Sequence, residues 1–143
     1  LVAQKGITDA DVYFNSPGGS LVAGMAIGRL LRQRGYDTHV GKRTADVHEL
    51  VGGVCYSACP FAYAGGVRRY LEFDSTLAVH RAENRLPLPD GSSFEKLVSQ
   101  QSTEYLLAMG VSPELFKIMS QVPHDVIRGL TRGEAERLML VNE

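Results

Sequence analysis

The fold is decided by the stretch Val12-Tyr13-Phe14-Asn15-Ser16-Pro17-Gly18-Gly19-Ser20, close to the beginning of the chain. Val-Tyr-Phe is β-branched and aromatic, which is typical of a strand, whereas Ser-Pro-Gly-Gly is a run of strand breakers. We therefore predict a strand over Asp11–Asn15 and a turn at Gly18 and Gly19.

A helix should follow this turn directly. Ser20 is a suitable N-cap, and Gly35 is a suitable C-terminal stop after Arg34. Between them apolar residues recur at helical spacing, namely Leu21, Met25, Ile27, Leu30 and Leu31. A second strand over Asp37–Gly41 would complete a βαβ unit, which implies parallel strands with a right-handed crossover. Gly24 and Gly28 lie four residues apart, so we expect this helix to pack closely on the sheet.

The rest of the chain predicts short strands and further helices. Polar residues over Lys42–Glu49 indicate an exposed loop, and the aperiodic segment Arg81–Ser93 indicates another. The expected elements are a buried helix over Ser57–Ala64, strands over Tyr70–Phe73 and Thr76–His80, an amphipathic helix over Phe94–Met109, a helix capped by Ser112 that runs to Ser120, and a helix from a Thr131 capping box to Leu138.

Composition narrows the class of protein. With 143 residues the chain is long enough for one hydrophobic core, so we expect a single domain over residues 1–143. The net charge is −1, from 15 Lys and Arg against 16 Asp and Glu, which argues against a nucleic-acid partner. No apolar run reaches the roughly 18 residues that a membrane span needs.

Both cysteines lie in Cys55-Tyr56-Ser57-Ala58-Cys59. A zinc site would need two further ligands, so we expect no metal here. A disulfide requires the local backbone to bring the two Cβ atoms within about 4 Å. We predict two buried thiols instead.

Four features could together form a hydrolase site. Ser57 opens a buried helix, where the helix dipole favours developing negative charge, and His80 ends an apolar strand. Asp125 follows Pro123-His124 in a turn, and Gly18 and Gly19 could offer main-chain N–H groups. Taken singly, each is more often structural: a helix cap, a strand-end histidine, a solvated aspartate and a plain turn.

The sequence resembles the ClpP family of serine proteases along nearly its whole length. The resemblance is carried by Val12–Ser20 with Gly24-Met25-Ala26-Ile27, by Ser57-Ala58 ahead of Ala64-Gly65-Gly66, by Val79-His80, and by Asp125 with Leu130-Thr131 and Glu134-Ala135. The spacing of 23 positions from Ser57 to His80 and of 45 from His80 to Asp125 also agrees. It is most similar to ClpP-like bacterial proteins, often expected to be exported, that carry a Cys-x-Ser-Ala-Cys segment.

This resemblance implies an α/β fold of the ClpP/crotonase type, with a mostly parallel sheet, βαβ units and flanking helices. It implies a serine peptidase that works through an acyl-enzyme, with Ser57 as nucleophile, His80 as base and Asp125 as the residue that orients the base. The oxyanion hole would use the backbone N–H groups of Gly18 or Gly19 and of Ala58. No metal or organic cofactor is implied.

Partners and location follow from the same resemblance. The expected substrate is a peptide or protein, and we expect a homo-oligomer with the helix Phe94–Met109 as its contact. The residues do not specify an unfoldase partner. The bacterial cytoplasm and the periplasm both fit, and the exported form is slightly favoured. The sequence also departs from the family: Arg81-Ala82 replaces Gln-Pro after the histidine, Arg81–Met109 is shorter than the ring-stacking handle, and the leading strand is expected to be missing or trimmed.

The same residues also permit alternative hypotheses. His48 in the loop before Leu50 is a rival base, and Lys96 on the long helix could replace His80, as in related membrane-bound serine proteases. A crotonase-type acyl-CoA enzyme would share the fold without needing the triad. A non-catalytic scaffold or binding protein would keep the fold with a misaligned triad.

Overall fold

The computed structural model describes residues 8–45, 49–82 and 94–143. Its first sheet has three parallel strands in the order β1-β2-β6, formed by β1 (Asp11–Phe14), β2 (Asp37–Val40) and β6 (Arg69–Leu71). The helix α1 (Leu21–Arg34) connects β1 to β2. The predicted βαβ unit with parallel strands is therefore confirmed.

A second sheet carries the strands that lead into the candidate site. It has the order β5-β7-β8, with β5 (Val54–Tyr56) parallel to β7 (Thr76–Val79) and β8 (Arg128–Leu130) antiparallel to β7. A bridge between Ser16 and Cys55 joins the end of β1 to β5. The segment after β1 and the end of β5 are thereby held side by side.

Four strands were not predicted from the sequence. β5 and β8 were not expected, and the predicted loop Lys42–Glu49 contains β3 (Lys42–Arg43), which pairs antiparallel with β4 (Leu50–Val51). The prediction of a loop throughout that segment was wrong, because polar residues also form strands where one face stays in water.

The ends of α1 are determined by its own sequence. Ser20 has an extended backbone, and its side chain accepts a hydrogen bond from the N–H of Ala23. Gly35 adopts φ 71°, a left-handed conformation that glycine reaches without steric cost, and its N–H returns to the carbonyls of Arg32 and Leu31. Both predicted caps are confirmed.

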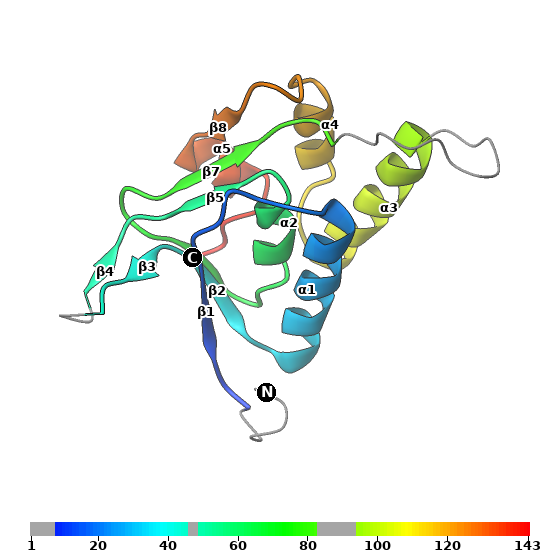
Figure 1. Ribbon diagram of the computed structural model, residues 1–143. Helices are drawn as coiled ribbons and strands as arrows, with labels where there is room; N and C mark the ends of the chain where they lie inside the picture. Colours follow the sequence, from blue (N-terminus) through cyan, green and yellow to red (C-terminus); the bar gives the residue numbers. More distant parts are fainter. Residues whose placement is uncertain (1–7, 46–48, 83–93) are drawn as a thin grey trace.

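Four further helices surround the sheets (Figure 1). They are α2 (Cys59–Tyr63), α3 (Phe94–Ala108), α4 (Glu114–Ser120) and α5 (Arg132–Arg137). The capping box predicted at Thr131 is present, because Thr131 and Glu134 exchange side-chain hydrogen bonds with each other's N–H. The Ser112 hydroxyl accepts from the N–H of Glu114, although the residue before α4 is Pro113.

The glycine face of α1 was predicted to pack on the sheet. It packs instead on α2 and on Tyr105 of α3. A Cβ on Gly24 would lie 2.8 Å from the carbonyl oxygen of Ala58, and one on Gly28 would lie 2.9 Å from that of Phe61. The Tyr105 hydroxyl of α3 donates to the same Phe61 carbonyl. The glycines therefore let the helix that follows Ser57 approach α1 at backbone distance.

The core lies between the sheets and these helices. Its largest fully buried side chains include Phe61, Tyr63, Leu77, Tyr105, Leu106, Leu115 and Leu140. α3 buries Val98, Tyr105 and Leu106, and Met109 just after it is also buried. Most of the apolar face expected to mediate self-association therefore packs inside the chain, while Leu97 and Leu107 are exposed. Within the described residues, no helix has both the length and the apolar character to cross a membrane.

Candidate active site

Ser57 occupies a sharp turn between β5 and α2. Its φ is 65°, a left-handed conformation that is unfavourable for a residue with a side chain. Its N–H donates to the carbonyl of Ala78 on β7, at 3.0 Å. The predicted helix over Ser57–Ala64 begins only at Cys59, so Ser57 precedes the helix and does not belong to it. Strain at a single residue of this kind is characteristic of functional sites.

His80 comes directly after β7 and meets Ser57. Because β5 and β7 are parallel, their carboxyl ends lie at the same edge of the sheet. The Nε2 atom of His80 lies 2.7 Å from the Ser57 hydroxyl oxygen. The structure thus brings together a serine and a histidine that are 23 positions apart in the sequence.

The second nitrogen of His80 is also engaged, and this contact defines the tautomer. Nδ1 lies 2.6 Å from the main-chain carbonyl oxygen of His124. A carbonyl oxygen only accepts hydrogen bonds, so Nδ1 carries the proton. In the neutral imidazole Nε2 is then the acceptor for the Ser57 hydroxyl, which is the arrangement that a general base requires. The rings of His80 and His124 are stacked with centroids 4.9 Å apart.

The predicted contact from Asp125 to His80 is not formed. The Asp125 side chain is exposed, and its carboxylate has no hydrogen bond or ion pair within the described part of the chain. The main-chain carbonyl of His124, the residue before Asp125, occupies the position beside Nδ1 of His80. A main-chain carbonyl carries no sequence signal, so residue types alone could indicate the turn after Pro123 but not which of its atoms faces His80.

Two main-chain N–H groups beside Ser57 are available as oxyanion donors. Among the described residues, the N–H groups of Gly19 and Ala58 have no hydrogen-bond acceptor, and both residues line the pocket next to Ser57. The N–H of Gly18 donates to the Ser16 hydroxyl at 3.1 Å. Of the two glycines predicted as backbone donors, Gly19 is therefore the one whose N–H has no acceptor among the described residues.

The backbone of Gly18 lies directly against Ser57. A Cβ at this position would lie 2.6 Å from the Ser57 Cβ and 2.8 Å from the carbonyl oxygen of Tyr56. Contacts this short do not occur between real side chains and their neighbours. The backbone of Gly18 thus forms one wall of the space that Ser57 occupies.

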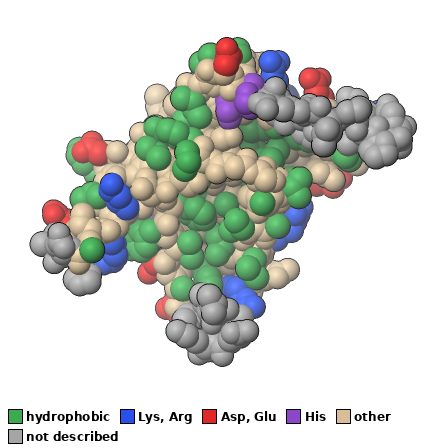
Figure 2. Space-filling model, viewed as in Figure 1, with side chains coloured by type: hydrophobic (Ala, Val, Ile, Leu, Met, Phe, Trp, Pro, Cys, Tyr) green, Lys and Arg blue, Asp and Glu red, His purple; other side chains and the backbone are tan. Residues whose placement is uncertain are grey.

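A pocket of about 350 Å³ opens beside Ser57 and His80. Apolar side chains form much of its wall, namely Leu21, Met25, Val98 and Met119. Histidine side chains are visible at the surface on this face of the molecule, and hydrophobic side chains gather over α1 on the same face (Figure 2). The site is therefore open to a ligand and has an apolar lining next to Ser57.

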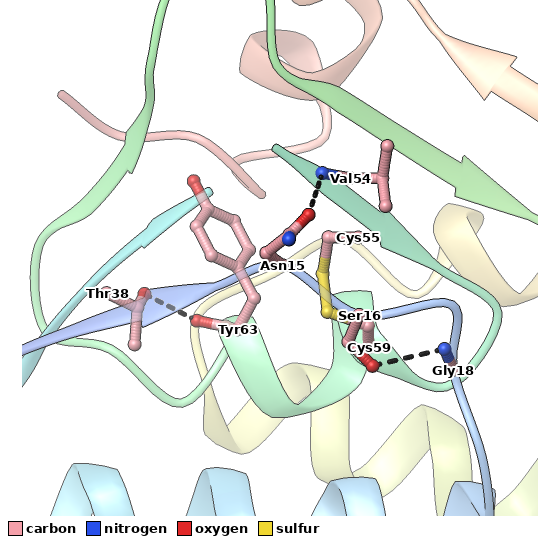
Figure 3. The surroundings of a disulfide bond; sticks show 8 residues. All are labelled: Asn15, Ser16, Gly18, Thr38, Val54, Cys55, Cys59 and Tyr63. Carbon is pink, nitrogen blue, oxygen red and sulfur yellow. Dashed lines mark hydrogen bonds between the residues drawn. A yellow bond between two sulfur atoms is a disulfide. The ribbon is translucent and has the colours of Figure 1, made fainter. Parts of the chain in front are cut away.

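Cys55 and Cys59 form a disulfide, which corrects the prediction of two buried thiols. The left-handed turn at Ser57 brings the end of β5 back toward the start of α2, with the two Cα atoms 5.1 Å apart. The bond ties the strand to the helix, next to Ser16 and Gly18 (Figure 3). Both cysteines are buried, at 0% and 4% exposure.

Lys96, one of the two rival bases, does not line this site. Lys96 is exposed on the first turn of α3 and is not among the described residues that line the pocket. His48 lies outside the described residues. Within those residues, no group of three or more His, Cys, Asp and Glu side chains is placed to hold a metal ion.

This fold is a ClpP-like protease fold, a mixed α/β architecture with parallel strands and flanking helices. No family model and no curated protein matches the sequence. Solved structures do match, and each of the three matches given below covers 99% of this chain.

The matching structures include peptidases from distant sources. The 1510-N membrane-bound stomatin-specific protease, in a mutant bound to a substrate peptide, matches with a TM-score of 0.63, 16% identity and 62% of its chain covered. ClpP1 from Listeria monocytogenes matches with 0.63, 17% and 76%. A peptidase from Plasmodium falciparum matches with 0.63, 11% and 81%. At these identities the likeness is one of fold, and the chain spans less than two thirds of the stomatin-specific protease.

Proposed function

We propose that this protein is a serine-type hydrolase that cleaves peptide or related acyl bonds through an acyl-enzyme. The observation that carries the proposal is the contact of 2.7 Å between the Ser57 hydroxyl and Nε2 of His80, in the tautomer that accepts the hydroxyl proton. The position of Ser57 in a strained turn beside a pocket supports it. The fold that the chain has in common with solved peptidases is consistent with this chemistry.

The proposed mechanism uses each of these groups. Ser57 attacks the substrate carbonyl while Nε2 of His80 takes the hydroxyl proton. The imidazolium keeps its Nδ1–H on the carbonyl of His124. The N–H groups of Gly19 and Ala58 stabilise the oxyanion of the tetrahedral intermediate.

The acyl-enzyme is then resolved by the same pair of residues. His80 returns its proton to the leaving amine, and Ser57 remains acylated. Water, activated by Nε2, releases the acid product and regenerates the serine. The predicted role of Asp125 as the orienting acid would require its carboxylate to replace the carbonyl of His124.

A peptide or protein substrate, self-association and an exported location belong to the same proposal. The apolar wall formed by Leu21, Met25, Val98 and Met119 favours an apolar side chain next to the scissile bond. Disulfides persist in oxidising compartments, so the bond between Cys55 and Cys59 supports an exported location. Size-exclusion chromatography with light scattering tests self-association, and a monomer at high concentration would contradict it.

The hydrolase proposal is tested by labelling the purified protein with a fluorophosphonate probe, followed by peptide mapping. We expect label on Ser57, and no label in Ser57→Ala or His80→Ala. Circular dichroism of the two variants controls for folding. A native chain that is folded but unlabelled would contradict the proposal. Binding of an acyl-CoA by that chain would then support the crotonase alternative, and its absence would support a scaffold.

A further inference from the structure

The disulfide encloses the candidate nucleophile. The chain leaves β5 through Cys55, reverses at Ser57 and enters α2 at Cys59, so that the bond closes a small ring around Tyr56, Ser57 and Ala58. Ser57 is also one of three described non-glycine residues with a positive φ. The residue with the strained backbone, Ser57, therefore lies inside the ring that the disulfide closes.

The two sides of this turn are held by different contacts. On the strand side, the N–H of Tyr56 donates to the carbonyl of Ser16 at 3.1 Å, and the N–H of Ser57 donates to Ala78. On the helix side, α2 spans five residues, and no side chain caps its beginning. A helix this short has little stability of its own. The disulfide is the covalent link that fixes the start of α2 against β5.

The direction of the Ser57 side chain depends on this link. A left-handed φ is unfavourable for serine, so a released turn would relax toward negative φ. That relaxation would rotate the hydroxyl away from Nε2 of His80 and would turn the N–H of Ala58, which belongs to the same turn. The geometry of nucleophile and oxyanion donor would be lost together.

We propose that the disulfide between Cys55 and Cys59 positions Ser57 for attack, so that the serine is reactive in the oxidised chain and loses reactivity when the bond is reduced. This inference rests on the proposed hydrolase function. The cysteines act through Ser57 and are positioning residues. With a dithiol reductant the S–S bond breaks, each cysteine becomes a thiol, and the dithiol is oxidised to its own disulfide.

The burial of the two sulfur atoms determines when the disulfide can be reduced. Cys55 is 0% exposed and Cys59 is 4% exposed, so a reductant reaches the bond only when the start of α2 opens. Access controls the rate of thiol–disulfide exchange. The bond therefore persists in an oxidising compartment, and the enzyme would be assembled in its reactive form there.

The experiment compares the oxidised and the dithiothreitol-reduced forms of the same chain. The measured quantity is the rate at which a fluorophosphonate labels Ser57 at saturating probe, alongside the concentration for half-maximal rate. We expect reduction to slow the labelling rate at least tenfold and to leave the half-maximal concentration within about twofold, because the apolar pocket wall is not part of the ring. Re-oxidation should restore the rate. Since the sequence contains two cysteines, any effect of the dithiol comes through this bond.

The matched control is the variant Cys55→Ala with Cys59→Ala. It should label at the slow rate whether or not dithiol is present. Circular dichroism at the assay temperature establishes that the reduced chain is folded. Equal labelling rates for oxidised and reduced chains would overturn the positioning role, and so would unfolding of the reduced chain, since the bond would then maintain the whole fold. Absence of label from the oxidised chain would instead contradict the hydrolase proposal.

Discussion

Nδ1 of His80 donates to the carbonyl oxygen of His124 at 2.6 Å, so the group that orients the candidate base is part of the main chain. An aspartate in this position holds the imidazole tautomer and also stabilises the imidazolium with its negative charge. The carbonyl of His124 supplies the first effect fully and the second only through its dipole. The base would therefore be correctly oriented but less strongly stabilised once protonated.

This arrangement makes Asp125→Asn a decisive substitution. Because the Asp125 carboxylate forms no hydrogen bond or ion pair with a described residue, we expect the variant to keep its fluorophosphonate labelling rate within about threefold of the native rate. In a triad whose aspartate holds the base, the same change lowers kcat about 10⁴-fold. The measurement is the second-order rate constant for labelling of Ser57, with His80→Ala as the inactive reference. A loss of more than about 10³-fold would return Asp125 to its predicted orienting role.

Gly18→Ala should damage the site and the fold together. The new methyl group would lie 2.6 Å from the Ser57 Cβ, on a backbone with φ 116°. Overpacking costs about 1–3 kcal/mol and a positive φ about 1–2 kcal/mol, so we expect the free energy of unfolding to fall by about 2–5 kcal/mol. Displacing the nucleophile by about 1 Å should slow labelling on the order of 100-fold. Urea unfolding and labelling kinetics measure the two effects.

The control for that variant is Gly133→Ala in α5. A Cβ at Gly133 meets no atom within 4 Å, and alanine is the better helix former. We expect unchanged labelling and equal or higher stability. A Gly18→Ala chain that behaved like this control would mean that Gly18 does not form a wall of the Ser57 site.

Local signals were sufficient for much of the fold. Ser20 and Gly35 cap α1 as predicted, because capping depends on the residue itself and on its own helix. The apolar run before His80 also predicted a strand that ends at a sheet edge, and β7 ends there, whereas the strand β5 that leads to Ser57 was not predicted.

Contacts that depend on the folded chain could not be predicted from residue types alone. Gly24 indicated close packing, but only the folded chain shows that its partner is the carbonyl of Ala58 on α2. The left-handed turn at Ser57 allows the disulfide, and neither could be read from residue types separately. β8 was missed because Arg128-Gly129-Leu130 has weak strand propensity and is recruited by pairing with β7.

The stability of the first sheet should depend on acid pH through Asp37. Burial raises the pKa of the Asp37 carboxyl, but hydrogen bonds and charge from Arg68 outweigh it, so the pKa lies below its ordinary value. A lowered carboxyl pKa contributes stability that is present above the unfolded pKa of about 4 and is lost as the pH falls through the folded pKa. We expect Arg68→Gln to lower the free energy of unfolding at neutral pH, and the difference to shrink as the pH falls below the unfolded pKa of about 4.

Urea unfolding at neutral pH and at acid pH measures the difference in free energy of unfolding between the native chain and Arg68→Gln. Arg137→Gln removes an exposed arginine that has no ion pair among the described residues, so it should keep the acid dependence of the native chain. A difference for Arg68→Gln that is the same at both pH values would mean that the charge of Asp37 is not what Arg68 stabilises.

The strain at Ser57 can be measured by comparing two inactive variants. Ser57→Ala keeps a Cβ on a backbone with φ 65°, whereas Ser57→Gly removes it. A left-handed conformation costs a non-glycine residue about 1–2 kcal/mol, and the greater flexibility of unfolded glycine returns about 0.5–1 kcal/mol of this. We therefore expect Ser57→Gly to be more stable than Ser57→Ala by about 0.5–1 kcal/mol, in contrast to the order expected in a helix interior. Urea unfolding of both variants, with the disulfide intact in each, gives the difference. If Ser57→Ala proved the more stable, Ser57 would not hold the left-handed turn, and the disulfide would have no strained conformation to maintain.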